Sequence, residues 1–125
     1  MKIGDADTLV EVTAAFHPCE AALQRNDVTA LDAMFVGSDR TVRYGVADVQ
    51  YGIDEVRRFR AMQKPFRRRL SRTGNTAPGP DVADEATLFH RDDFPGQTGR
   101  QTQVWVRTAD GWQVAAAHVN RMDDL

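Results

Sequence analysis

The stretch "GRQTQVWVRTADGWQVAAAHV", residues 99–119, predicts two strands joined by a tight turn at "ADG". Because alternate side chains of a strand point to opposite faces, Gln101, Gln103 and Trp105 share one face of the first strand with Arg107. The other face carries Arg100, Thr102, Val104 and Val106. Neither face is purely apolar. The function inferred for the chain therefore depends on whether Gln101 and Gln103, beside Trp105, face a pocket, a packed core or the surface.

The second strand places small side chains near these glutamines. Strict alternation predicts that Gln113, Ala115, Ala117 and Val119 share one face. Burying an unpaired amide costs about 1 to 3 kcal/mol, whereas small alanines opposite glutamines leave space for water or a ligand. We therefore interpret this face as the wall of a pocket. The alternative is that the glutamines lie on an exposed or dimeric face of the sheet.

Helices are predicted ahead of the sheet from the three- and four-residue spacing of apolar side chains. The first covers residues 7–25 and contains Pro18, which we expect to kink the helix near residues 14–16 or to divide it into two short helices. Two more helices are expected: one capped by Asn26 or Asp27 with Leu31, Met34 and Phe35 facing inward, and one over residues 53–63 with Ile53, Val56, Phe59 and Met62 facing inward.

The remaining segments are predicted to be extended. Residues 40–46, "RTVRYGV", form a strand, and residues 48–52, "DVQYG", form a short return. Helices segregated from a long antiparallel meander predict a single α+β domain over residues 1–125. Its twisted sheet should curl around the helices and leave a cavity between them. The four strands of the meander are expected at residues 67–77, 82–91, 98–108 and 112–121.

Composition limits the function. The chain has 125 residues, a net charge of -2 and one cysteine, which together predict a globular protein without an internal disulfide or a footprint for nucleic acid. No apolar run approaches the roughly 20 residues of a membrane span, and the acidic start does not suit a signal peptide, so we expect no membrane contact and a cytoplasmic location. The basic run at residues 57–69 is interpreted as a solvated helix face and edge strand rather than a polyanion site.

Cofactor chemistry has no support in the sequence. There is no phosphate loop, no GxSxG and no cofactor fingerprint, so we expect no cofactor. His17 and His90 have no spacing to each other or to carboxylates that would make a metal site, and none is assigned.

A succession of motifs covers almost the whole chain: "CEAALQRND", "LDAMF", "RTVRYG", "QYGIDEVRRFR", "GRQTQVWVR" and "DGWQVAAAHVN". Together they resemble the NTF2-like (SnoaL-like) superfamily and, within it, the AtzH-like branch that includes oxalurate-catabolism proteins. The resemblance implies a cone-shaped α+β barrel, usually a homodimer through the sheet, with a pocket between helices and sheet. Members of the branch are encoded beside amidohydrolases of ureido-acid and triazine breakdown, and one associated activity is decarboxylation of a carboxylated urea.

Two residue roles follow from the resemblance alone. The family's arginine in "RYG" maps onto Arg43, and the tyrosine of its "YEAAL" pattern maps onto Cys19 of "CEAAL". If that phenol donates a proton or anchors a carboxylate, Cys19 cannot reproduce its reach or its hydrogen bond. We therefore expect catalytic activity to be altered or lost.

The arginines independently indicate an anionic ligand. Arg43 lies among apolar neighbours in "TVRYGV", and Arg72 alternates with Leu70, so both could direct their guanidinium groups at one carboxylate. An arginine binds a carboxylate through two charge-assisted hydrogen bonds. The alternative for each arginine is a surface or structural ion pair.

The remaining candidate site residues also have structural alternatives. Tyr44 would contact substrate or, because it alternates away from Arg43, belong to the core or an interface. His118 would be catalytic or a satisfied structural histidine of an apolar strand. Glu20 and Glu85 could supply a base if they are buried.

These observations leave three hypotheses. The first is a cofactor-free decarboxylase or hydrolase of a small carboxylated urea or amide, with Arg43 and Arg72 holding the carboxylate and Gln101, Gln103 and Trp105 contacting the rest. The second is a non-catalytic pocket protein that binds a small carboxylate or ureido acid and serves an amidohydrolase as partner. The third is an isomerase of the ketosteroid type, which needs a buried carboxylate base opposite an oxyanion donor.

Overall fold

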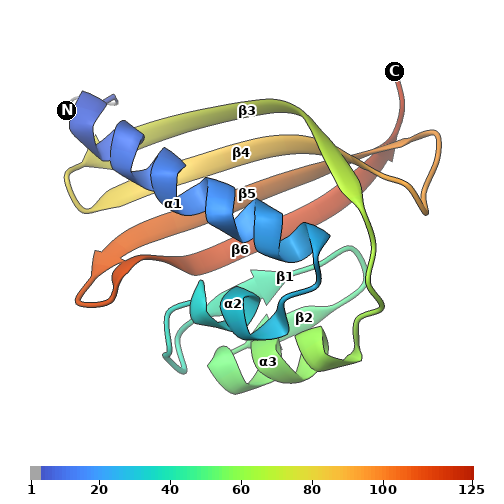
Figure 1. Ribbon diagram of the computed structural model, residues 1–125, viewed down its shortest axis with the longest axis horizontal. Helices are drawn as coiled ribbons and strands as arrows, with labels where there is room; N and C mark the ends of the chain where they lie inside the picture. Colours follow the sequence, from blue (N-terminus) through green and yellow to red (C-terminus); the bar gives the residue numbers. More distant parts are fainter. Residues whose placement is uncertain (1–3) are drawn as a thin grey trace.

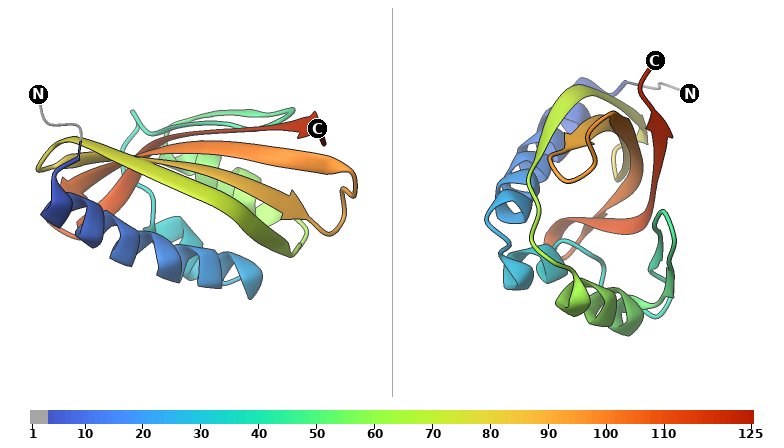
Figure 2. Two further views of the ribbon diagram at one scale, coloured as in Figure 1. Left: turned by 90° about the horizontal axis from the view of Figure 1, so that it is seen from above. Right: turned by 90° about the vertical axis from the view of Figure 1, so that its right-hand side faces the viewer.

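A curved sheet forms the larger part of the fold, and helices lie on its concave side (Figure 1). The computed structural model describes residues 4–125, and within them the sheet has six strands in the order β2-β1-β6-β5-β4-β3. Viewed along the molecule, the sheet curls around the space that α1 covers (Figure 2). The strands are β1 (Val42–Tyr44), β2 (Val49–Tyr51), β3 (Arg68–Gly79), β4 (Val82–Arg91), β5 (Gln97–Thr108) and β6 (Gly111–Asp123).

The first helix, α1 (Ala6–Gln24), is continuous. The Asp5 side chain caps it by accepting a hydrogen bond from the Thr8 amide at 3.0 Å. Pro18 lies inside the helix, so the predicted division into two short helices is wrong. Phe16 before the proline and Ala22 after it are both buried, and we attribute the continuity of the helix to this packing, which offsets the roughly 3 kcal/mol that an internal proline costs.

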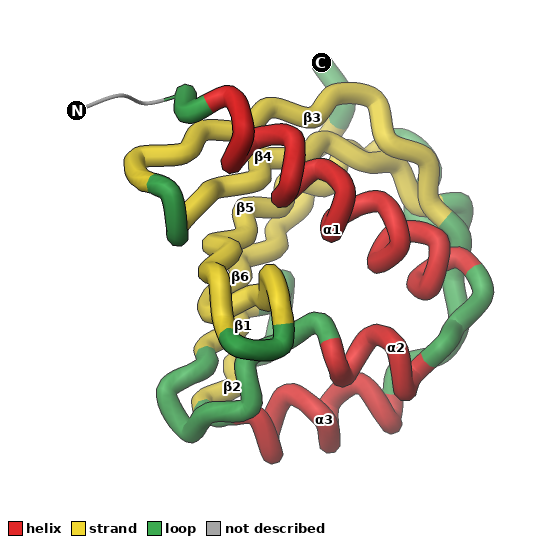
Figure 3. The backbone as a smooth tube through the Cα atoms, turned by 60° about the vertical axis from the view of Figure 1, so that its left-hand side comes forward, coloured by secondary structure: helices red, strands yellow, loops and turns green. Residues whose placement is uncertain are grey.

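The two shorter helices begin as the sequence predicted. The Asp27 side chain caps α2 (Val28–Ala33) by accepting from the Ala30 amide at 3.1 Å. Helix α3 (Ile53–Met62) begins at Gly52 and ends before Pro65. Val56 of α3 is buried as expected, but Met62, the last residue of the helix, is 79% exposed, so its predicted inward position is wrong. All three helices face the strands from one side (Figure 3).

The strand pairing adds one feature to the predicted meander. Strands β3 to β6 pair antiparallel in sequence order, as the sequence predicted. Strand β1 pairs in parallel with β6, with Arg43 opposite Ala117, and β2 closes this edge of the sheet. The chain therefore brings a short segment that precedes α3 next to its last strand.

Two β-bulges change which side chains face the helices. In β6, Val114 pairs with Trp105 and Ala116 with Val104, so Ala115 is the extra residue. As a result Val114 is buried opposite Trp105. The predicted common face is right for Ala117 and Val119, which lie opposite Gln103 and Gln101 and line the cavity, and wrong for Gln113 and Ala115.

The second bulge lies in β3, where Leu70 pairs with Phe89 and Arg72 pairs with Leu88. Ser71 is the extra residue here. Leu70 packs against the core, whereas Arg72 is exposed, so the two residues no longer share a face.

The core lies between α1 and the concave face of β4, β5 and β6. Trp105 at its centre is 0% exposed and contacts a cluster that includes Val12 and Phe16 of α1. None of the helices in residues 4–125 is both long enough and apolar enough to cross a membrane.

Candidate functional site

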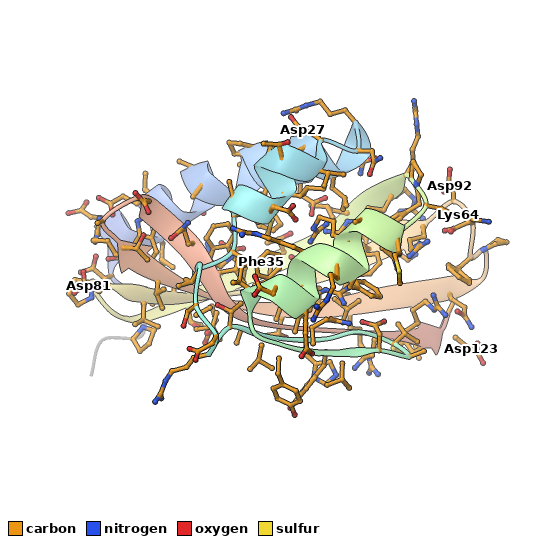
Figure 4. All side chains as sticks on the ribbon, turned by 90° about the horizontal axis from the view of Figure 1, so that it is seen from below. Asp27, Phe35, Lys64, Asp81, Asp92 and Asp123 are labelled. Carbon is orange, nitrogen blue, oxygen red and sulfur yellow. The ribbon has the colours of Figure 1, made fainter. Side chains whose placement is uncertain are left out.

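A cavity of about 120 Å³ lies between the three helices and the concave face of the sheet. Aromatic rings make up much of its wall: Phe16, Phe35, Phe59, Phe66 and Phe89. Figure 4 shows Phe35 near the middle of the molecule, between α2 and α3, and Lys64 toward the end where Asp92 lies. Since sites for drug-sized ligands measure about 300–1,000 Å³, this cavity suits a small molecule.

The charged side chains of the wall are mostly basic. Among the described residues, the only acid that lines the cavity is Glu20. The basic lining residues are Arg43, Arg60, Lys64, Arg68 and Arg91. This imbalance favours an anionic ligand.

Arg43 reaches the cavity from β1, where Ala117 leaves room beside it. Its Nη1 donates to Asp48 Oδ1 at 2.7 Å and to Gln50 Oε1 at 3.0 Å, and its guanidinium lies 4.7 Å from the centre of the Phe59 ring. Burial lowers the pKa of Arg43, and Asp48 opposes that shift. Both contacts use the same nitrogen, so the other guanidinium nitrogens of Arg43 have no acceptor among residues 4–125.

Arg60 reaches the same cavity from α3. Its Nε forms an ion pair with Asp32 Oδ1 at 3.6 Å, a distance too long for a hydrogen bond, so neither of these buried atoms has a hydrogen-bond partner in the described chain. Burial and then repulsion from Arg43 lower the pKa of Arg60. Two partly buried guanidinium groups therefore repel each other in the cavity wall, and the neighbouring carboxylates Asp48 and Asp32 partly offset this repulsion.

Arg68 at the start of β3 is fully engaged, in contrast to Arg43 and Arg60. Its Nε and Nη2 bind the two carboxylate oxygens of Glu20, with 3.2 Å from Nε to Oε2, and its Nη1 donates to Gln101 Oε1 at 3.3 Å. Its side chain is only 5% exposed, and its guanidinium lies 4.3 Å from the centre of the Phe89 ring. A two-pronged pair of this kind holds the Arg68 charge in place and neutralises it.

Glycine at position 99 positions the ring behind Arg68. Gly99 pairs with Phe89 across β4 and β5, and a Cβ atom at Gly99 would lie 2.2 Å from the Phe89 ring. Only a residue without a side chain lets the ring lie flat over the strand at this point, which leaves the Arg68 guanidinium a surface to stack on.

The two glutamines of the opening stretch face the interior, as their alternation predicted: Gln101 is 8% and Gln103 is 5% exposed. Gln103 Oε1 accepts from the Trp105 indole at 3.1 Å, and Gln101 Oε1 accepts from Arg68. Indole and guanidinium are donors only, so these contacts fix which end of each amide carries the oxygen. The amide nitrogens of both glutamines donate to no residue of the described chain, and both residues line the cavity.

Cys19 lines the cavity from α1 and is half-buried. Its Sγ donates to the Ala15 carbonyl at 3.4 Å. Burial raises the pKa of the thiol to about 11, with a further contribution from Glu20 that Arg60 partly offsets. The thiol is therefore protonated and unreactive at neutral pH.

The structure brings together part of the predicted site and leaves part of it outside. Arg43, Cys19, Gln101 and Gln103 line one cavity, whereas Trp105 faces inward but belongs to the packed core. Arg72 is exposed, so the expectation that it would join Arg43 at one carboxylate is wrong: the bulge at Ser71 turns its side chain to the outer face.

Tyr44 and His118 lie on the outer face of the sheet, away from the cavity. They are register partners in β1 and β6, and their rings meet edge to face with centres 5.8 Å apart. The Tyr44 and Tyr51 hydroxyls are hydrogen-bonded at 2.7 Å. Tyr44 is therefore available for contact with another chain rather than with a ligand in the cavity. His118 does not line the cavity, so its predicted catalytic role there is wrong.

Sequence reasoning missed Arg60 and Arg68. Both belong to the basic run at residues 57–69, which was interpreted as a solvated face. The spacing of α3 contained a usable signal: Arg60 is four residues after the buried Val56 and therefore lies on the same helix face. Arg68 had no such signal, because its inward direction depends on where β3 begins.

Glu85, one of the two carboxylates considered as a base, is buried outside the cavity. Glu85 is 1% exposed, accepts from Asn75 Nδ2 at 3.2 Å, and has a pKa raised by burial, but it does not line the cavity. Within residues 4–125, no group of three His, Cys, Asp or Glu side chains could hold a metal ion.

Comparisons with known proteins agree with this architecture. A protein of unknown function of the DUF3225 family from Pectobacterium atrosepticum SCRI1043 is 42% identical, with a TM-score of 0.91 over 98% of this chain and 96% of that one. A cystatin-like fold protein from Burkholderia xenovorans LB400 is 40% identical, with a TM-score of 0.93 over 100% and 99% of the two chains. None of the curated proteins matches the chain.

More distant structures share the fold alone. An NTF2-like protein of unknown function from Pseudomonas putida KT2440 is 18% identical, with a TM-score of 0.81 over 98% of each chain. Helices on a curved sheet, with a cavity between them, define an NTF2-like protein of cystatin-like fold. Within that class the chain belongs to the AtzH-like family, whose model matches residues 1–125. The predicted fold class and the family resemblance are confirmed.

Proposed function

We propose that the protein binds a small carboxylate in the cavity, with Arg43 and Arg60 holding the carboxylate group. The observation that carries this proposal is the pair of partly buried guanidinium groups in the cavity wall. Each has an ion pair of its own, with Asp48 or Asp32, and each also keeps nitrogens that donate no hydrogen bond within residues 4–125. A carboxylate between them would offset their mutual repulsion and supply the missing acceptors.

The aromatic wall supports a compact ligand rather than an extended one. A cavity of about 120 Å³ is far smaller than a steroid site, and the one buried carboxylate of the sheet, Glu85, lies outside the lining. Both features count against an isomerase of the ketosteroid type.

A catalytic role, such as decarboxylation or hydrolysis of a carboxylated urea, would need a proton donor near the bound ligand. Cys19 occupies the position where the family resemblance places a tyrosine, and its short side chain, whose thiol already donates to the Ala15 carbonyl at 3.4 Å, cannot reproduce the reach of a phenol. This favours a binding role, as an accessory protein of an amidohydrolase, over catalysis by the chain alone.

Calorimetry with propionate, succinamate and succinate tests the proposal. Arg43→Ala should weaken binding of the carboxylates by at least about tenfold, and Arg43→Lys should recover part of that loss because it keeps the charge but not the two-pronged geometry. Arg72→Ala is the matched control, since it removes an exposed arginine outside the cavity, and it should bind as the wild type does.

Thermal unfolding establishes that each variant is folded. If no carboxylate binds to the wild type, or if folded Arg43→Ala binds with unchanged affinity, the anion site is excluded.

A further inference from the structure

A thin wall closes the cavity at the end where α3 leads into β3. Asn26, Pro65 and Phe66 line the cavity. The same three residues also line an open groove on the outer surface, next to Asp92 and Asp93. Because they border both spaces, the wall between the cavity and the surface is one residue thick at this place.

The segment that carries this wall is held at both ends and free between them. It runs as an extended strap from α3 to β3 (Figure 1). At one end the Gln63 amide donates to the Arg60 carbonyl at 3.1 Å, and at the other end the Arg67 and Asp92 residues exchange two hydrogen bonds of 3.3 and 3.0 Å. Among the described residues, the backbones of residues 64–66 form no hydrogen bond. This part of the strap can therefore move without breaking backbone hydrogen bonds.

The Phe66 ring closes against an arginine that is itself fixed. The guanidinium of Arg91 lies 3.6 Å from the centre of the Phe66 ring, a cation–π contact. Asp93 holds Arg91 in place, with 2.8 Å from Nε to Oδ1 and 2.5 Å from Nη2 to Oδ2. The Phe94 ring contacts the same guanidinium at 4.8 Å but does not line the cavity.

From this arrangement we infer that Phe66 is a gate: its ring separates the outer groove from the cavity, Arg91 acts as the latch that holds it closed, and small molecules enter when the ring turns away from Arg91. Arg68 also borders the cavity and an outer groove, but Glu20 binds it through both prongs, so it does not offer an equally ready opening. A gate controls the rate at which molecules enter and leave. This role is independent of which ligand the cavity binds.

Cys19 can report passage through the gate. It is the only cysteine of the chain, and it lines the same cavity as Phe66. Iodoacetamide is small enough to pass an open gate, whereas a maleimide carried on a long polyethylene glycol chain reacts with a buried cysteine only when the protein unfolds. The ratio of the iodoacetamide rate to the polymer rate, measured at one fixed pH, therefore separates passage through the wall from unfolding.

Phe66→Ala should raise this ratio at least about tenfold, because it removes the ring that closes the passage. Phe66→Tyr keeps the ring and should keep the wild-type ratio. Phe94→Ala is the matched control, since it removes a ring from the same guanidinium without opening the cavity wall, and its ratio should equal that of the wild type. Arg91→Lys keeps the charge but removes the flat group on which Phe66 stacks, so it should raise the ratio less than Phe66→Ala does.

Thermal unfolding establishes which variants are folded. An unchanged ratio in folded Phe66→Ala, or an equal rise in Phe94→Ala, would overturn the gate. If Phe66→Ala does not fold, Arg91→Lys decides, and an unchanged ratio there would overturn it. A ratio that rises in Phe66→Ala but not in Arg91→Lys would support Phe66 as the gate and refute Arg91 as its latch.

Discussion

The indole of Trp105 donates its hydrogen bond to the side-chain oxygen of Gln103 at 3.1 Å, and both residues are buried. They lie two positions apart on the same face of β5. This contact answers the question that the glutamines of residues 99–107 raise: Gln103 has one polar end committed to the core and the other end free at the cavity wall.

Gln103→Leu should therefore destabilise the protein by about 1 to 3 kcal/mol, because it leaves the Trp105 N–H buried without an acceptor. Urea unfolding measures the loss. The double variant Gln103→Leu/Trp105→Phe lacks both the acceptor and the N–H donor, so no buried donor is left unpaired. Its loss of stability should therefore be smaller than the sum of the losses in the two single variants. Additive losses would show that the contact has no energetic role.

Cys19 should react slowly with iodoacetamide at neutral pH. Because burial raises its thiol pKa to about 11, the reactive thiolate should increase about tenfold per pH unit on the way to that value. Mass spectrometry follows the reaction at this single cysteine, and the chain unfolded in urea provides the reference rate. A folded protein that reacts as fast as the unfolded chain at pH 7 would contradict the buried environment.

Glu85 should make the folded protein lose stability as the pH rises. Burial raises its pKa above the ordinary value of 4.5, so the folded state binds more protons than the unfolded state in this range, and the free energy of unfolding falls with increasing pH. Glu85→Gln keeps the shape and the contact with Asn75 without a charge.

Urea unfolding from about pH 4 to pH 7 measures this difference. The variant should gain stability relative to the wild type as the pH rises. A constant difference between the two proteins across that range would contradict the argument.

The proposed homodimer should form through the outer face of the sheet. Tyr44, Tyr51 and Val49 are 37%, 56% and 57% exposed there, beside His118. Tyr51→Lys should shift the protein toward a monomer in light scattering at micromolar concentration, because it places a charge in the contact. Val10→Lys changes a 71% exposed residue of α1 and should not affect assembly. A monomeric wild-type protein would refute the dimer.

The sequence predicted the regular parts of the fold well. Alternation along β5 placed Gln101, Gln103 and Trp105 correctly because no bulge interrupts that strand between them. The cap at Asp27 and the end of α3 before Pro65 were also recognisable, since each has a local chemical cause.

The errors in the site have two physical origins. One extra residue in a strand reverses the face of every residue after it, and neither Ser71 nor Ala115 is a residue type that announces a bulge. Arg72 was therefore expected on the cavity side of β3 together with Leu70, whereas Arg68 is the arginine of this strand that lines the cavity. The pairing of Arg68 with Glu20 joins residues from β3 and α1, and no local pattern reports such a contact.

The parallel pairing of β1 with β6 joins two distant segments of the chain, and we expect it to form late in folding. Arg43 lies opposite Ala117, about 70 residues later in the chain, so β1 has no neighbour on that side until β6 has formed. Contacts between such distant segments form late because closing the long intervening loop costs entropy first. A chain in which only β3 to β6 had paired would already bring Arg68 and Gln101 together, yet it would lack the carboxylate site until β1 docked against β6 and brought Arg43 into place.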